Sequence, residues 1–99
     1  MRLSEHDRLA ICQVTREVAG IGARVYLFGS RTRDDLRGGD IDLLVELPEA
    51  GSDKLAVSLR TGARLQRLIG ERKIDVLVVD PATAETPLIR AARREGIAL

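Results

Sequence analysis

Residues 25–46, VYLFGSRTRDDLRGGDIDLLVE, contain the pattern that decides the fold. Residues 24–28 are rich in strand-forming side chains and stop at Gly29, which predicts a strand that ends in a turn. Residues 40–47 are mostly apolar and predict a second strand. The polar stretch between them, residues 30–39, predicts a loop that joins the two strands.

The remaining elements follow from helical periodicity and from a second apolar run. Apolar residues recur at helical spacing after Ser4, which predicts a helix that ends at Gly20. Residues 53–69 predict a second helix, and the Thr-Pro pair at 86–87 predicts the start of a last one. Residues 73–80, KIDVLVVD, are almost continuously apolar and predict a third strand at the centre of the sheet. The expected order is α-β-β-α-β-α, an α/β (α+β) domain with a small mixed sheet.

The predicted second helix has two distinct sides. Four apolar residues cluster on the side expected to pack: Leu55, Leu59, Leu65 and Ile69. Three arginines lie together on another side: Arg60, Arg64 and Arg67. This arginine side is expected to face solvent, although it would also suit an acidic partner.

Length and composition restrict the class of protein. A chain of 99 residues suits one domain that spans residues 1–99. Hydrophobic residues at 44% argue against disorder, and aromatic residues at 2% argue against the stacking surfaces of single-stranded nucleic-acid binders. The net charge of +1 gives no general attraction to nucleic acids or membranes. The single Cys12, expected to be a small buried side chain, excludes an internal disulfide. With no signal peptide or long apolar run, a cytoplasmic protein is expected.

Two aspartates open the second predicted strand. Asp40 and Asp42 are separated by one residue, so the strand period of two places both carboxylates on one face, with Cα atoms ~7 Å apart. Two neighbouring carboxylates repel each other unless a cation lies between them, and hard oxygen ligands favour magnesium or manganese. A site that holds two such ions can activate an attacking oxygen and neutralise a leaving phosphate.

The preceding turn has the composition of an anion-binding loop. Gly29 lets a phosphate approach the backbone closely, and Ser30 adds a hydroxyl donor. Arg31, Arg33 and Arg37 follow in the loop and could reach triphosphate oxygens. Alone, a Gly-Ser pair is usually a turn and an Asp-x-Asp pair is usually a solvated strand start. Their combination across one polar loop favours a functional site.

This segment resembles the polymerase-beta-like nucleotidyltransferase superfamily, and within it the minimal nucleotidyltransferase (MNT) proteins. Their pattern is a Gly-Ser pair, a spacer of nine or ten residues, an Asp-x-Asp pair and a third acid on a later strand. The matching residues in this chain are Gly29, Ser30, Asp40, Asp42 and Asp75. The chain departs from the pattern at Gly39, where a serine commonly precedes the first aspartate. This change removes one hydroxyl but no ligand.

The resemblance implies a nucleotidyltransferase fold and a transferase that uses ATP as substrate. It implies release of pyrophosphate and catalysis with two bound Mg²⁺ ions, with three residues as both metal ligands and catalytic acids: Asp40, Asp42 and Asp75. The nucleotide is expected to bind at Gly29, Ser30, Arg31 and Arg33.

The expected partner also follows from the resemblance. Minimal members often act as antitoxins beside a HEPN-domain ribonuclease, and some adenylylate a tyrosine of that toxin. Others are paired with a separate helical substrate-binding protein. A chain of this length is not expected to contain an acceptor-binding domain, so a HEPN-type toxin or a helical partner is the expected acceptor. Transfer to a small molecule and neutralisation of a toxin by contact alone are the alternatives.

Two aspartates are candidates for the third acid. Asp75 lies at the start of the third predicted strand, where it would reach the same cleft as Asp42 and act as general base. Its alternative role is an exposed residue paired with Lys73 or Arg72. Asp80 lies at the end of that strand, before a proline, where a turn or cap role is expected. It is the next candidate if Asp75 does not act.

Overall fold

The computed structural model describes residues 3–29, 41–70 and 72–99. The elements in these ranges are α1 (Glu5–Ala19), β1 (Arg24–Phe28), β2 (Ile41–Glu46), α2 (Lys54–Ile69), β3 (Ile74–Val79), α3 (Pro87–Glu95) and β4 (Ile97–Ala98). The predicted order α-β-β-α-β-α is confirmed, with β4 as an addition at its end. Two residues are too few to show a strand period, so the sequence carried no signal for β4. The predicted loop of residues 30–39 lies outside the described residues.

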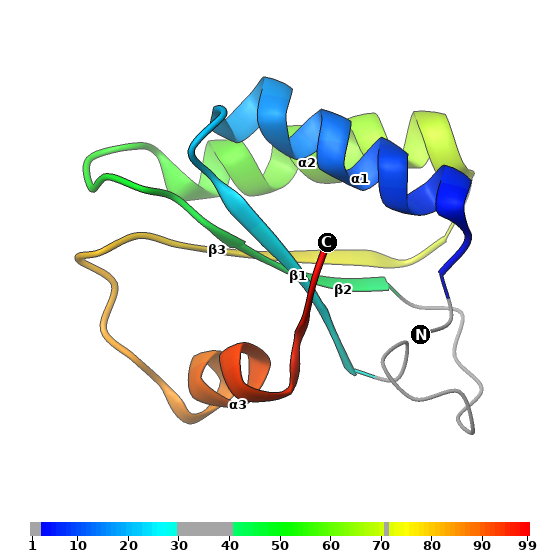
Figure 1. Ribbon diagram of the computed structural model, residues 1–99. Coiled ribbons are helices and arrows are strands. Elements are labelled where there is room, and N and C mark those ends of the chain that lie inside the picture. The colour runs from blue at the N-terminus through cyan, green and yellow to red at the C-terminus, as the bar shows by residue number, and fades with distance from the viewer. Residues whose placement is uncertain (1–2, 30–40, 71) are drawn as a thin grey trace.

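The strands form a mixed sheet in the order β3-β2-β1-β4 (Figure 1). β1 pairs antiparallel with β2 and with β4, while β2 and β3 run parallel. Within the described residues β3 therefore lies at an edge of the sheet, and the prediction that it is central was wrong. Its apolar run has another cause: Val76 and Val78 pack in the core beneath α1 and α2, and Leu77 and Val79 pack toward α3.

Helices cover both faces of the sheet (Figure 1), with α1 and α2 together on one face and α3 on the other. Alternation along β2 distributes its side chains between these layers. Ile41, Leu43 and Val45 belong to the core beneath α1 and α2, whereas Leu44 packs with Ile89 of α3. The residues of β2 that share the face of Leu44 are consequently on the α3 side of the sheet.

Side-chain caps set the helix ends that the sequence predicts. Ser4, Asp53 and Thr86 each accept a hydrogen bond from a backbone N–H in the first turn of α1, α2 and α3. Gly20 and Gly70 follow the last residues of α1 and α2 and have positive φ, which favours glycine. No helix in the described residues is both long enough and apolar enough to cross a membrane.

The packed side of α2 differs from the prediction. Leu65 and Ile69 are buried as expected, but Leu55 and Leu59 are 68% and 65% exposed. The buried stripe of the helix consists of Thr61, Leu65 and Ile69, which are spaced four residues apart. Leu55 and Leu59 lie off this stripe, because α2 rests on the sheet along a narrower face than its apolar residues would allow.

Candidate active site

Asp42 and Asp75 lie side by side on neighbouring strands. In the parallel pairing of β2 with β3, Asp42 is the register partner of Asp75. Side chains at paired positions point to the same face of a sheet, and adjacent strands are about 4.8 Å apart. This is the α3 side, because Leu44 and Leu77, two residues further along each strand, pack in the cluster with α3. The fold thus aligns two carboxylates across the β2–β3 pair.

The two carboxylates differ in their surroundings. Asp42 is half-buried, whereas the Asp75 side chain is 58% exposed. Nζ of Lys73 lies 4.0 Å from Oδ2 of Asp75, so the alternative pairing that the sequence suggested is present at the limit of an ion pair. Lys73 is itself exposed, and an exposed pair at this distance contributes little. The Asp75 carboxylate therefore stays accessible to a cation or to a substrate.

Gly29 brings the backbone after β1 against Asp42. Its φ of +79° belongs to the left-handed region that favours glycine. A Cβ added at Gly29 would clash with Oδ2 of Asp42 and would lie 3.3 Å from its Cγ. Phe28, the last residue of β1, is the register partner of Asp42. The turn predicted to bind phosphate thus begins in direct contact with one of the predicted acids.

The other predicted site residues lie outside the described residues: Ser30, Arg31, Arg33, Arg37 and Asp40. Within the described ranges no group of three or more His, Cys, Asp or Glu side chains could hold a metal ion. These ranges supply two aligned carboxylates, Asp42 and Asp75, and the third predicted ligand, Asp40, belongs to the segment that precedes β2. Its contribution stays a prediction.

A groove of about 680 Å³ adjoins the aligned carboxylates. We call it the edge groove. Its lining comes mainly from α2 and β3, with one residue each from β1, β2 and α3. The lining residues are Phe28, Asp42, Ser58, Leu59, Gly62, Ala63, Gln66, Ile74, Asp75, Val76, Leu77 and Leu88. Sequence reasoning missed the α2 contribution. The small side chains at Ser58, Gly62 and Ala63 were the available signal, but the prediction that Leu59 lies on the packed side of the helix obscured it.

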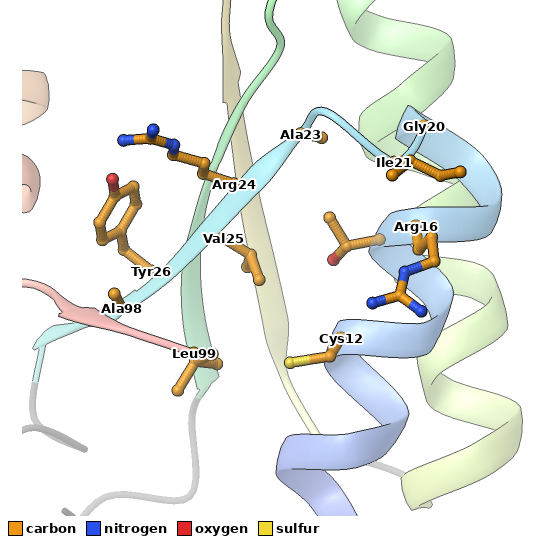
Figure 2. A pocket seen from close by; sticks show the side chains of 11 residues that line it. Cys12, Arg16, Gly20, Ile21, Ala23, Arg24, Val25, Tyr26, Ala98 and Leu99 are labelled. Carbon is orange, nitrogen blue, oxygen red and sulfur yellow. The ribbon is translucent and has the colours of Figure 1, made fainter.

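A second pocket, of about 360 Å³, lies between α1 and β1 and reaches Ala98 and Leu99, toward the edge of the sheet opposite β3 (Figure 2). Cys12, Arg16, Val25 and Leu99 are among its lining residues. Cys12 is half-buried there, so it is less enclosed than the sequence suggested. The described residues that line this pocket include no Asp or Glu, and a carboxylate-based metal site is therefore possible at the edge groove but not here.

Asp80 has the structural role that the sequence favoured. It is 4% exposed and follows β3, at the opposite end of the strand from Asp75. Its Oδ1 accepts hydrogen bonds from the Ala82 N–H (2.9 Å) and the Thr83 hydroxyl (3.0 Å), and its Oδ2 lies 3.3 Å from Lys54 Nζ. Burial raises the pKa of Asp80, but the hydrogen bonds from Thr83 and Lys54 outweigh burial and hold it below its usual value. Both carboxylate oxygens of Asp80 therefore have partners that stabilise the turn after β3.

Comparison with known proteins identifies the kind of domain. Residues 11–98 match the sequence profile of a family described as a nucleotidyltransferase domain. A search among curated proteins found no match. The matched range includes β1, β2 and β3, and with them Gly29, Asp42 and Asp75.

We expect Gly29→Ala to abolish binding of magnesium and ATP, because the new Cβ would displace the Asp42 carboxylate. A non-glycine residue at positive φ also costs about 1–3 kcal/mol, so the fold should be weakened but retained. Gly70→Ala is the matched control, since Gly70 has a φ of +91° but nothing within 4 Å of an added Cβ. Thermal melts with and without magnesium and ATP separate the two effects. A ligand-induced shift in Gly29→Ala equal to that of Gly70→Ala would contradict the proposed placement.

Asp80→Asn should lower the thermal midpoint at pH 7 and leave the shift caused by magnesium and ATP unchanged. The folded-state pKa of Asp80 is depressed, so its contribution to stability is present above the unfolded-state pKa and is lost as pH falls through the folded value. The difference in midpoint between the wild type and Asp80→Asn should therefore shrink below about pH 4. Melts at pH 7 and pH 3 measure this, and loss of ligand binding at pH 7 would return Asp80 to the candidate acids.

Proposed function

The chain belongs to the nucleotidyltransferase domain family, and we propose that it is a magnesium-dependent enzyme that transfers AMP from ATP to a hydroxyl group of a partner protein. The observation that carries this proposal is the register pairing of Asp42 with Asp75 beside the turn at Gly29. An aligned carboxylate pair next to a glycine turn has the parts that nucleotidyl transfer requires, namely oxygen ligands for a cation and a backbone that a phosphate can approach.

The donor set would suit magnesium. Asp42 and Asp75 would supply hard oxygen ligands from one face of the sheet. Asp40, the third ligand that we propose, precedes β2 in the sequence and lies outside the described residues. When bound there, magnesium would neutralise charge on the triphosphate and on the leaving pyrophosphate. Both described carboxylates line the edge groove.

The residues of the chain then have distinct tasks. Gly29 and Ser30 would bind phosphate oxygens, and Arg31 and Arg33 would hold the triphosphate by charge-assisted hydrogen bonds. Asp75 would accept the proton of the acceptor hydroxyl as its oxygen bonds to the α-phosphorus. The bond from that phosphorus to the pyrophosphate oxygen breaks in the same transfer. A tyrosine hydroxyl, with an ordinary pKa near 10, would need such a base.

A protein acceptor is favoured over a small polar molecule by the surface around the acids. Leu59 and Leu88, 65% and 59% exposed, line the groove that contains Asp42 and Asp75. Exposed leucines that gather at one site are typical of protein-binding surfaces. A HEPN-type toxin whose tyrosine is adenylylated is the partner we propose, with the chain as its antitoxin.

Magnesium and ATP should stabilise the folded protein. At a hundred times the dissociation constant the gain is about 2.7 kcal/mol, which would raise the midpoint by roughly ten degrees or more in a domain of this size. Asp42→Asn should abolish the shift and remain folded. A wild-type melt that does not move at millimolar magnesium and ATP would exclude the proposed activity.

Asp75→Asn should keep most of its binding of magnesium and ATP, because we expect that affinity to rest mainly on Ser30, Asp40 and Asp42. It should transfer AMP at least a hundredfold more slowly, because general-base assistance contributes about 10²–10⁴ in rate. Transfer is measured as AMP added to the protein encoded beside this chain, by intact mass. Lys73→Ala is the control for the ion pair and should keep its rate. Near-full transfer by Asp75→Asn would remove this role, and a partner that is bound and silenced without added AMP would favour neutralisation by contact.

A further inference from the structure

One edge of β3 has backbone groups that the sheet does not use. The carbonyl of Lys73, just before β3, accepts from the Ile41 N–H (2.9 Å), and the carbonyl of Val79 accepts from the Leu47 N–H (2.8 Å). Both bonds join β3 to β2 at odd-numbered positions. In a parallel ladder the intervening residues direct their N–H and C=O groups to the opposite edge.

The outward-facing residues are Ile74, Val76 and Val78. In the described part of the chain, the one hydrogen bond found at their outer edge is donated by the Ser58 hydroxyl to the Val76 carbonyl (2.8 Å). α2 thus covers a single acceptor of this edge. The other outward groups are available to a further strand, and unpaired edge groups of this kind are a common site of strand addition.

The edge groove runs beside these groups and has room for side chains. Leu59 on α2 and Leu88 on α3 flank it with exposed apolar surface. Three of the five α2 residues that line the groove have small side chains, namely Ser58, Gly62 and Ala63, and a Cβ added at Gly62 meets nothing within 4 Å. A backbone edge beside an apolar hollow matches an extended polypeptide, which offers both hydrogen-bonding groups and alternating side chains.

The positions of Asp42 and Asp75 in the sheet determine which residue of an added strand would lie next to them. Asp42 and Asp75 occupy paired positions on β2 and β3, one strand spacing apart. A third strand paired with β3 would place one of its residues beside Asp75, on the same face and about 4.8 Å further out. A hydroxyl on that residue would lie next to the carboxylate that is 58% exposed. The residues immediately before and after it would point to the α2 side, toward Gly62.

We propose that the acceptor binds as an extended polypeptide segment added to the free edge of β3, with its hydroxyl-bearing residue opposite Asp75. This inference rests on the proposed function and specifies its substrate. The acceptor oxygen forms the bond to the α-phosphorus, its proton passes to Asp75, and pyrophosphate leaves with the electrons of the broken P–O bond. Leu59 and Gly62 select acceptors with apolar residues on both sides of the hydroxyl residue.

The test uses nine-residue peptides with a central Tyr, Ser or Thr and varied flanking positions. They are incubated with the chain, magnesium and ATP labelled at its α-phosphate. Labelled peptides should be enriched in apolar residues immediately before and after the centre. In the best peptide, N-methylation of the alternate amides that face β3 should reduce labelling about tenfold or more, which corresponds to roughly one lost hydrogen bond. N-methylation of the intervening amides should have little effect.

Variants of the chain supply matched controls. Leu59→Glu and Gly62→Leu should reduce peptide labelling about tenfold or more, because the first places a charge in the hollow and the second fills it. Leu68→Glu changes another exposed leucine of α2, one that does not line the edge groove, and should label peptides as the wild type does. Gly62→Leu also raises helix propensity, so that loss of labelling in this variant does not reflect a weakened helix.

The two proposals fail in different ways. If magnesium and ATP still shift the melt but no peptide is labelled, strand addition is wrong while nucleotide binding stands. Labelling that is insensitive to N-methylation, to Leu59→Glu and to Gly62→Leu overturns it equally. If magnesium and ATP do not shift the melt, the proposed function itself fails, and this inference fails with it.

Discussion

The parallel pairing of β2 with β3 is the constraint on which the candidate site depends. The backbone ladder fixes Asp42 and Asp75 at paired positions, so that the whole β2–α2–β3 unit holds the two carboxylates in one register. Burial of the apolar residues that follow Asp42 on β2 stabilises this pairing, since Leu43, Leu44 and Val45 are fully buried. A cation at this site would meet two carboxylates whose positions the packing of the sheet already fixes.

Much of this arrangement could be predicted from the sequence, because local signals specify it. The strand period places Asp42 on the face opposite Ile41 and Leu43, and Ser4 and Thr86 mark two helix starts. The expected position of Asp40 on the face of Asp42 stays a prediction, because Asp40 lies outside the described residues. The register between β2 and β3 has no local signal. A shift of one residue would have turned Asp75 toward α2, and only the crossover through α2 and the fit of the core decide against it.

The two errors have a common physical origin. Both predictions, that β3 is central and that one apolar side of α2 is packed, assume that hydrophobic residues are completely buried. The apolar residues of β3 pack against helices on both faces of the sheet. Such packing does not require a neighbouring strand on each edge of β3. In α2 the exposed Leu55 and Leu59 report a surface that the described residues leave uncovered. An apolar pattern shows which residues would suit a buried position. It does not show whether the folded chain buries them, and Leu55 and Leu59 stay exposed.

The edge position of β3 is also what the proposed chemistry requires. If a further strand of the chain paired with β3, it would occupy the space next to Asp75 and close the carboxylate pair to any acceptor. Leaving the strand at the edge carries a hazard, since unpaired backbone beside exposed leucines invites association with other chains. The Ser58 hydroxyl, which donates to the Val76 carbonyl, reduces this hazard near the middle of the strand. Ile74, on the other side of Asp75, has no hydrogen bond to its outward groups within the described residues, and a partner strand would pair there first.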